Sequence, residues 1–312
     1  MAKEYQNWLK KCYMNKKFPV IYFVYAVFAI GFFLWLIFGL TLLIASLITS
    51  TTLGLIFLIL IPAIISAIAI LLAFSAASPL INDFMVSFRR LFRIDNLSNP
   101  LLLKLSLNAP GTYHHSINVS NIAQKAAKAV GADSLLVRVA AYYHDIGKLD
   151  NPEFFLENQP DNQSPTQEPQ KAAKIIISHV TDGVKMAKAN HLTDEICDLI
   201  SEHHGTTLVN YFFDVAQKTD GKTLREDYRY PGPKPSSKES GILMLADSAE
   251  AAIRSIKNIS KETITEYVQK VIHEKIESGQ LENCGLSDKD LNKIKISLID
   301  TLNVIYHRRI VR

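Results

Sequence analysis

YHDIGK, Tyr143–Lys148, is the stretch around which the rest of this sequence is organised. Its adjacent His144 and Asp145 end an apolar segment, where a buried imidazole or carboxylate without a partner is costly. Imidazole and carboxylate are also the ligand types that suit zinc, manganese and iron. The hexapeptide therefore predicts one part of a metal site, for which other segments must supply further ligands.

Further candidate ligands lie on both sides of the hexapeptide, and they are His115, His179, the pair His203-His204, and Asp247. Spacing alone does not decide between His115 and its neighbour His114. Asp247 lies in an apolar segment, where a carboxylate needs a cation or a strong donor. A salt bridge to Arg254 is the alternative for Asp247. The remaining histidines have polar surroundings and are predicted to be surface residues: His191, His273 and His307.

Glycines follow both of the adjacent pairs. Neighbouring side chains point about 100° apart on a helix, so they cannot share one face. His144-Asp145 precedes Gly147, however, and His203-His204 precedes Gly205. At a helix end both members of a pair can reach one cavity, so we expect the pairs to converge.

Composition excludes several other kinds of site. The 312 residues carry a net charge of +4, which is too weak and too scattered to indicate a nucleic acid polymer as partner. The cysteines Cys12, Cys197 and Cys284 are far apart, and none belongs to a Cys-x-x-Cys pair. This pattern argues against a disulfide framework or a thiolate zinc site and fits a reducing cytosol.

The N-terminal part of the chain is apolar. After a basic segment, residues 1–17, no charged residue occurs in residues 18–80, which a short polar break at Ser50–Gly54 divides into two runs. Each run is long enough to cross a bilayer, which predicts a hairpin of two transmembrane helices. A signal peptide followed by a buried helix is the alternative. Lysines before the hairpin and Arg89, Arg90 and Arg93 after it place both ends in the cytoplasm, at the inner membrane.

Residues 81–98 are predicted to form a juxtamembrane connecting helix, and residues 99–312 an all-α cytoplasmic domain without useful strand alternation. We expect helices over about 101–107, 112–130, 134–145, 171–178, 182–189, 193–204, 210–216, 240–256, 259–278 and 287–307. Thr112 is expected to cap the second of these helices, and His179 to end the fourth. Residues 151–169, rich in Asn and Pro, are expected to form a mobile loop.

The ordered ligand set resembles the HD superfamily of metal-dependent phosphohydrolases, and most closely the seven-transmembrane HD phosphodiesterases of the PgpH type, which hydrolyse cyclic di-AMP. The matching stretches are Asn99–Leu102, Ala109–Ser116, Ala141–Lys148, Ile177–Val180, Glu202–Val209, Tyr228–Pro235 and Leu243–Ser248. The family typically adds an extracytoplasmic sensor domain and seven membrane helices, whereas this chain has two membrane runs. The chain is therefore interpreted as a natural short form or a fragment.

The resemblance implies a role for each candidate ligand. It selects His115 over His114, makes His144 a ligand and makes Asp145 the carboxylate that bridges two metals. His179, His203 and His204 would complete one metal, and Asp247 would help to complete the other. The implied cofactors are two divalent ions, iron or manganese.

Two such ions about 3.5–4 Å apart can activate a hydroxide and hold both the attacking and the leaving oxygens. The resemblance thus implies hydrolysis of cyclic di-AMP to linear pApA. Lys148, or less strongly Arg254, would stabilise charge on the phosphoryl oxygens. Thr206, Thr207 and Tyr211 are candidate nucleotide contacts by their position after the histidine pair.

Two other functions remain open from the sequence. Related HD enzymes act on cyclic di-GMP, guanosine tetraphosphate or nucleoside triphosphates; the cyclic di-GMP branch usually has Gly-Tyr-Pro after its histidine pair, where this chain has Gly205-Thr206-Thr207. The second is a non-catalytic receptor that binds the dinucleotide. The expected partners are the dinucleotide and the lipid bilayer, and the sequence also allows a homodimer.

Overall fold

A computed structural model describes residues 94–159, 168–220, 224–256 and 258–307, with a few isolated positions before them. The predicted N-terminal segment, residues 1–17, lies outside the described residues. So do almost all of the predicted hairpin and most of the connecting helix. Within the described part of the chain, no helix is both long and apolar enough to cross a bilayer. The chain divides into two compact units, Met1–Arg93 and Ile94–Arg312.

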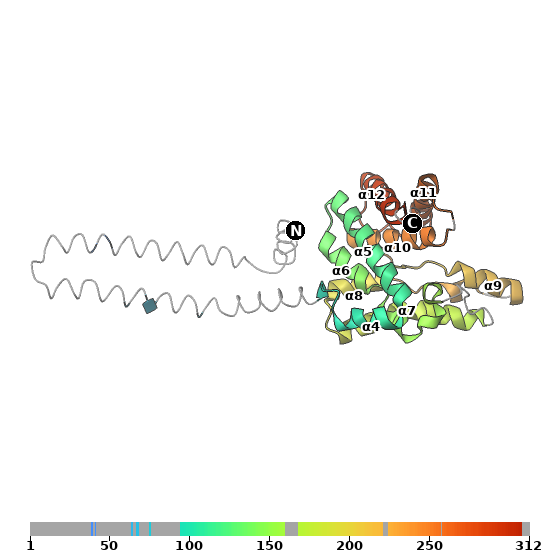
Figure 1. Cartoon of the computed structure of the whole chain (residues 1–312), viewed down its shortest axis with the longest axis horizontal. Helices are drawn as coiled ribbons and strands as arrows, with labels where there is room; N and C mark the ends of the chain where they lie inside the picture. The colour runs from blue at the N-terminus through green and yellow to red at the C-terminus, as the bar shows by residue number, and fades with distance from the viewer. Residues whose placement is uncertain are drawn as a thin grey trace, which may run out of the picture. The chain divides into compact units, whose positions relative to one another are not determined.

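The second unit is helical (Figure 1). Its α-helices are α4 (Pro100–Asn108), α5 (Pro110–Val130), α6 (Ser134–Tyr143), α7 (Pro169–Ala189), α8 (Asp194–Glu202), α9 (Asn210–Asp220), α10 (Lys238–Arg254), α11 (Lys261–Glu277) and α12 (Asp288–His307). Short 3-10 helices connect them: η1 (Ile146–Asp150), η2 (Pro152–Phe154), η3 (Leu156–Asn158) and η4 (Arg225–Tyr228). The only β-type pairing among the described residues is one isolated bridge between Leu208 and Arg229. The all-α prediction is confirmed for this part of the chain.

Helix α5 lies at the centre of the unit. It packs against α4, α6, α10 and α12. Many of its buried positions carry small side chains, among them Ser116, Ser120, Ala123 and Ala127, which let the neighbouring helices approach closely. In Figure 1, α11 and α12 lie beside each other, whereas α9 projects from the bundle.

Helix α10 is the most thoroughly buried segment. Residues 242–246, which are Ile, Leu, Met, Leu and Ala, are all fully buried. A helix that is apolar on nearly every side must lie within the core. Ser237 begins α10 with a capping box, because its hydroxyl accepts from the Ser240 amide while Ser240 reaches back to the Ser237 amide.

The beginning of the unit is attached to α6. The hydroxyl of Tyr143 donates a hydrogen bond of 2.8 Å to the carbonyl of Ile94, and both residues are buried. Arg138, one and a half turns earlier on α6, pairs with Asp95. These contacts join the first described residues of the unit to the helix that immediately precedes His144.

Several predicted helix limits are wrong. Thr112 does not cap α5, because Pro110 already occupies the first turn and the Thr112 amide donates instead to Asn158 Oδ1. One continuous helix, α7, spans Pro169–Ala189, so His179 lies in its middle rather than at an end. Helix α6 ends at Tyr143, and η1 then carries the chain onward. Part of the predicted mobile loop is ordered as η2 and η3.

Candidate metal centre

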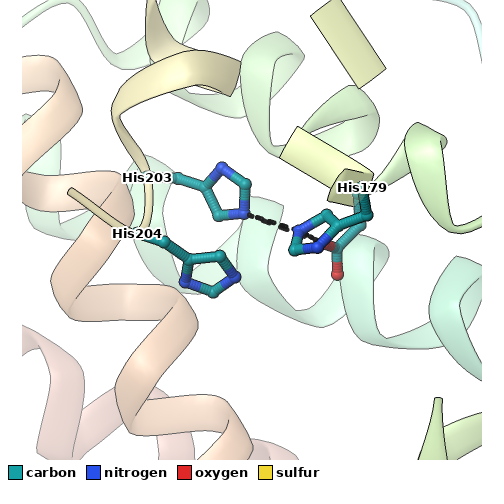
Figure 2. Close-up of side chains that lie close together, drawn as sticks. His179, His203 and His204 are labelled. Carbon is teal, nitrogen blue, oxygen red and sulfur yellow. Dashed lines mark hydrogen bonds and ion pairs between the residues drawn. The ribbon is translucent and has the colours of Figure 1, made fainter. Parts of the chain in front are cut away.

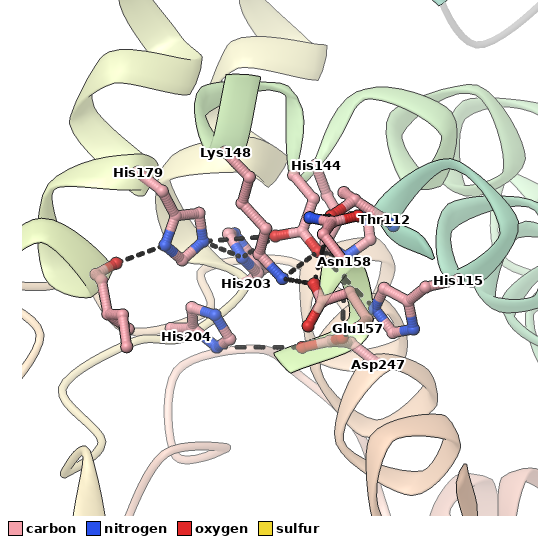
Figure 3. Close-up of polar contacts among 12 residues, drawn as sticks. Thr112, His115, His144, Lys148, Glu157, Asn158, His179, His203, His204 and Asp247 are labelled. Carbon is pink, nitrogen blue, oxygen red and sulfur yellow. Dashed lines mark hydrogen bonds and ion pairs between the residues drawn. The ribbon is translucent and has the colours of Figure 1, made fainter. Parts of the chain in front are cut away.

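Five α-helices or their ends bring the predicted ligands together (Figure 3). α5 carries His115, α6 ends just before His144-Asp145, α7 carries His179, α8 ends just before His203-His204, and α10 carries Asp247. All seven side chains are buried except that of His204, which is 21% exposed. The two adjacent pairs therefore lie at helix ends, as their positions before glycines predicted.

Asp145 lies at the centre of the cluster. Its Oδ1 is 3.3 Å from His179 Nε2 and 3.8 Å from His203 Nε2. Its Oδ2 is 3.2 Å from His144 Nε2 and 3.6 Å from His115 Nε2. One carboxylate therefore faces two sets of imidazoles, one with each oxygen.

Three of the histidines are held in the same way. The Nδ1 atoms of His144, His179 and His203 each lie at hydrogen-bond distance from the carbonyl three residues earlier in the chain. A carbonyl can only accept, so in the neutral ring Nδ1 carries the proton and Nε2 presents its lone pair. Figure 2 shows His179 and His203 with their Nε2 atoms facing each other, 3.3 Å apart. Two lone pairs at that distance repel unless a proton or a metal ion lies between them.

Asp247 completes the cluster on its other side. Its Oδ1 lies 2.9 Å from His115 Nε2 and 3.5 Å from His144 Nε2, and its Oδ2 lies 3.8 Å from His204 Nδ1. The alternative salt bridge to Arg254 is not formed. The Arg254 guanidinium instead lies 3.5 Å from Glu250 and 3.8 Å from Glu157.

These atoms could hold metal ions in three overlapping groups, within each of which the ligand atoms lie within 4.8 Å of one another. The groups are Asp145-His179-His203-His204, His115-His144-Asp145 and His144-His203-Asp247. Asp145 belongs to two of the groups, as expected of a carboxylate shared between two ions. A set of imidazoles and carboxylates suits manganese, iron or zinc.

Unsatisfied buried atoms support this reading of the cluster. Among the described residues, His144 Nε2 and Asp145 Oδ1 have no hydrogen-bond partner. The other carboxylate oxygen, Asp145 Oδ2, is paired with Lys148 Nζ at 2.7 Å. A buried polar atom left unpaired costs about 1–3 kcal/mol, and more when it is charged. Divalent cations would satisfy the two unpaired atoms, so the residues present fit a metal centre.

The carboxylates of the cluster favour positive charge on a neighbouring group, whereas its imidazoles disfavour positive charge on one another. Burial raises the pKa of the Asp145 carboxyl, but the neighbouring His144 and Lys148 outweigh it and hold that pKa well below its usual range. Burial lowers the pKa of His203, and the nearby His144 and His179 lower it further, to about 3. Burial opposes charge on His144 too, yet Asp145 and Asp247 raise its pKa to about 10. Protons or metal ions can supply this charge, and metal binding releases the protons.

Lys148 lies at the edge of the cluster and is held by two carboxylates. Its Nζ is 2.7 Å from Asp145 Oδ2 and 2.7 Å from Glu157 Oε1. Burial lowers the pKa of Lys148, but both carboxylates raise it above the ordinary lysine value, so the side chain is charged. Glu157 belongs to η3, and its Oε1 accepts a hydrogen bond of 3.2 Å from the hydroxyl of Thr112 on α5. No pattern in its polar segment singles Glu157 out.

Two other residues at the site were missed from the sequence. Tyr230 stacks on the ring of His204, with 4.3 Å between ring centroids. Glu250 lies 2.5 Å from His115 Nδ1. A signal for Glu250 was available, because it follows Asp247 by three residues on an apolar helix and so shares its face.

The predicted nucleotide contacts are placed unevenly. The Thr207 hydroxyl donates to the His204 carbonyl at 2.8 Å, and the Thr206 amide donates to Gln280. Tyr211 is 53% exposed on α9, and its ring packs edge-on against Phe212. No contact among the described residues joins Tyr211 to the histidine cluster. His191 and His273 are exposed, as predicted, and the side chain of His307 lies outside the described residues. His114, which the spacing did not distinguish from His115, is exposed as well.

Known proteins resemble the second unit of this chain. Residues 112–252 match the family described as HD domain. The chain is 44% identical over 228 residues to "Cyclic-di-AMP phosphodiesterase PgpH" of Bacillus subtilis and 42% identical to its namesake in Listeria monocytogenes. Each match covers 72% of this chain but 32% of the relative, so the chain spans about a third of the length of the curated relatives it matches.

A solved structure covers the same unit. It is the crystal structure of the L. monocytogenes phosphodiesterase PgpH HD domain in complex with cyclic-di-AMP. That domain is 43% identical to this chain, with a TM-score of 0.65, and the match covers 68% of this chain and all of that domain. By this match, this chain belongs to the HD-domain family.

Proposed function

We propose that this chain is a metal-dependent phosphodiesterase that hydrolyses cyclic di-AMP to linear pApA. The observation that carries the proposal is the buried Asp145 carboxylate, whose two oxygens face separate sets of imidazole Nε2 atoms. The choice of substrate rests on the relatives, which are named for cyclic di-AMP, one of them with that molecule bound to its HD domain.

Two divalent cations, iron or manganese, would supply an activated hydroxide and would stabilise charge on the phosphoryl oxygens. The residues that would hold them are His115, His144, Asp145, His179, His203, His204 and Asp247. Carbonyl contacts at Nδ1 fix three of the imidazoles, so little rearrangement is needed to present their Nε2 atoms.

Lys148 would bind the phosphate. Its charged ammonium group lies beside Asp145, and stabilising developing charge is worth most where water is excluded. Glu157 already occupies the other side of this ammonium group. An entering phosphate would therefore compete with Glu157 for Lys148, and also for Arg254, which lies 3.8 Å from the same carboxylate.

Turnover tests the proposal. The chain is purified, stripped of metal with a chelator and supplied with Mn²⁺ or Fe²⁺, and the products are separated by chromatography. We expect cyclic di-AMP to be converted to pApA with metal and not without it, and cyclic di-GMP to be a poorer substrate. No linear product with either metal would refute the enzyme, and tight binding of cyclic di-AMP without turnover would favour a receptor.

We also propose that residues 18–80 anchor the chain in the inner membrane as a two-helix hairpin with both ends in the cytoplasm. The support is the absence of charged residues over this segment and the basic residues that flank it. We expect the chain to sediment with membranes at high salt and to resist alkaline extraction. Protease added outside intact spheroplasts should leave residues 94–312 intact, and their cleavage would contradict the orientation.

A further inference from the structure

Glu250 is a fully buried carboxylate that the proposed chemistry does not use. It lies on α10, and its Oε2 is 2.5 Å from His115 Nδ1. Its Oε1 accepts hydrogen bonds from the Tyr306 hydroxyl at 2.8 Å and from Asn118 Nδ2 at 3.2 Å. Arg254 Nε lies 3.5 Å from Oε2. Four groups from three helices thus converge on one buried carboxylate.

His115 is held differently from the other ligands. His144, His179 and His203 each direct Nδ1 at a neutral backbone carbonyl, whereas His115 directs Nδ1 at a carboxylate. A carboxylate behind a ligating histidine fixes the proton on the outer nitrogen and makes the inner one a stronger ligand. The inner nitrogen, His115 Nε2, faces Asp145 and Asp247.

We propose that Glu250 is a positioning residue that directs the Nε2 lone pair of His115 into the cluster and strengthens one metal site rather than both. Tyr306, near the end of α12, and Asn118 hold the carboxylate in place. Helix α12 thereby supports a metal site to which it contributes no predicted ligand. The inference rests on the proposed metal-dependent function, and it adds a residue that controls the strength of one half of the centre.

The competing explanation is structural, because Glu250 also ties α5, α10 and α12 together. A structural role lowers the stability of the metal-free protein and leaves the affinity for metal unchanged once the protein is folded. A positioning role lowers the affinity for one metal ion. Titration with Mn²⁺ separates the two explanations.

The test uses the full chain in detergent, as wild type and as Glu250→Gln, stripped of metal and titrated with buffered Mn²⁺. We expect one of two bound Mn²⁺ ions to weaken about 10–100-fold and the other to change little. Glu239→Gln is the matched control: Glu239 is a buried carboxylate of the same helix that accepts from the Asp133 amide at 2.8 Å. This control is expected to bind Mn²⁺ like wild type.

Wild-type affinity for both ions in folded Glu250→Gln, or equal weakening of both, would overturn the inference. If Glu250→Gln does not fold, Tyr306→Phe decides, with an expected weakening of about fivefold at one ion and wild-type binding as the contrary result. The titration uses no substrate, so it tests the inference independently of the turnover assay. If wild type binds two Mn²⁺ ions tightly but does not turn over cyclic di-AMP, the proposed activity is refuted and the inference about Glu250 is not. A wild type that binds no Mn²⁺ would overturn both.

Discussion

Replacing Asp145 by asparagine is expected to lower turnover of cyclic di-AMP about 10³-fold or more and to reduce the amount of bound metal. The substitution keeps the shape of the side chain and removes its negative charge. Each carboxylate oxygen faces a different set of imidazoles, so the change affects both halves of the proposed centre.

The amide of asparagine cannot present an oxygen atom to both sets of imidazoles. A carboxylate accepts through both oxygens, whereas one end of an amide is an NH₂ donor. The Nε2 atoms of His144 and His179 approach opposite oxygens of Asp145, at 3.2 Å and 3.3 Å. Whichever way the amide turns, one of the two proposed metal ions would lose a ligand atom. Lys148, 2.7 Å from Oδ2, also loses one of its two anionic partners.

Metal content by atomic emission and initial rates with saturating Mn²⁺ measure the effect. Asp290→Asn is a suitable control, because Asp290 lies on α12 and pairs with Lys238 rather than with a histidine of the cluster. The control is expected to match wild type in both measurements. Wild-type metal content together with wild-type turnover in Asp145→Asn would exclude Asp145 from the site.

The candidate ligands could be identified from sequence because metal chemistry uses few side-chain types, which stand out in apolar segments. The structure brings all seven of them into one cluster and buries His115 while leaving His114 exposed. The supporting residues carry weaker signals. Glu157 is ordinary in its local sequence, and Tyr230 lies in a matching stretch but outside the expected helices. Only the folding of η3 and of the segment after η4 brings these two residues to the site.

Helix limits were harder to predict where tertiary contacts outweigh local preference. Residues Thr181-Asp182-Gly183 suggest a break, because Asp and Gly favour helix ends over helix interiors. In the structure α7 continues through them. Gly183 lies against Gly147 of η1, so the missing side chain serves close packing rather than a turn. Sequence periodicity does not reveal a contact between segments this far apart.

The same contact predicts a second large effect, at Gly147. A Cβ atom added there would lie 1.9 Å from the carbonyl oxygen of His179 and 2.5 Å from the amide nitrogen of Gly183. Both are backbone atoms of α7, so the clash cannot be relieved by turning a side chain. We expect Gly147→Ala to lower the free energy of unfolding by about 3 kcal/mol or more.

Gly147→Ala should also disturb the metal centre. Moving α7 away from η1 moves His179, whose Nε2 lies 3.3 Å from Asp145 Oδ1, and removes a ligand from the group formed with His203 and His204. Urea unfolding followed by circular dichroism, together with Mn²⁺ binding by the folded fraction, measures both effects.

Gly131→Ala separates this clash from backbone strain. Gly131 has a φ of 74°, and a Cβ atom there would have nothing within 4 Å. This variant is expected to lose only about 1–2 kcal/mol, the cost of a left-handed conformation, and to bind Mn²⁺ normally. If Gly147→Ala lost no more stability than Gly131→Ala and kept its metal, the backbone of η1 could not lie as close to α7 as the His179–Asp145 geometry requires.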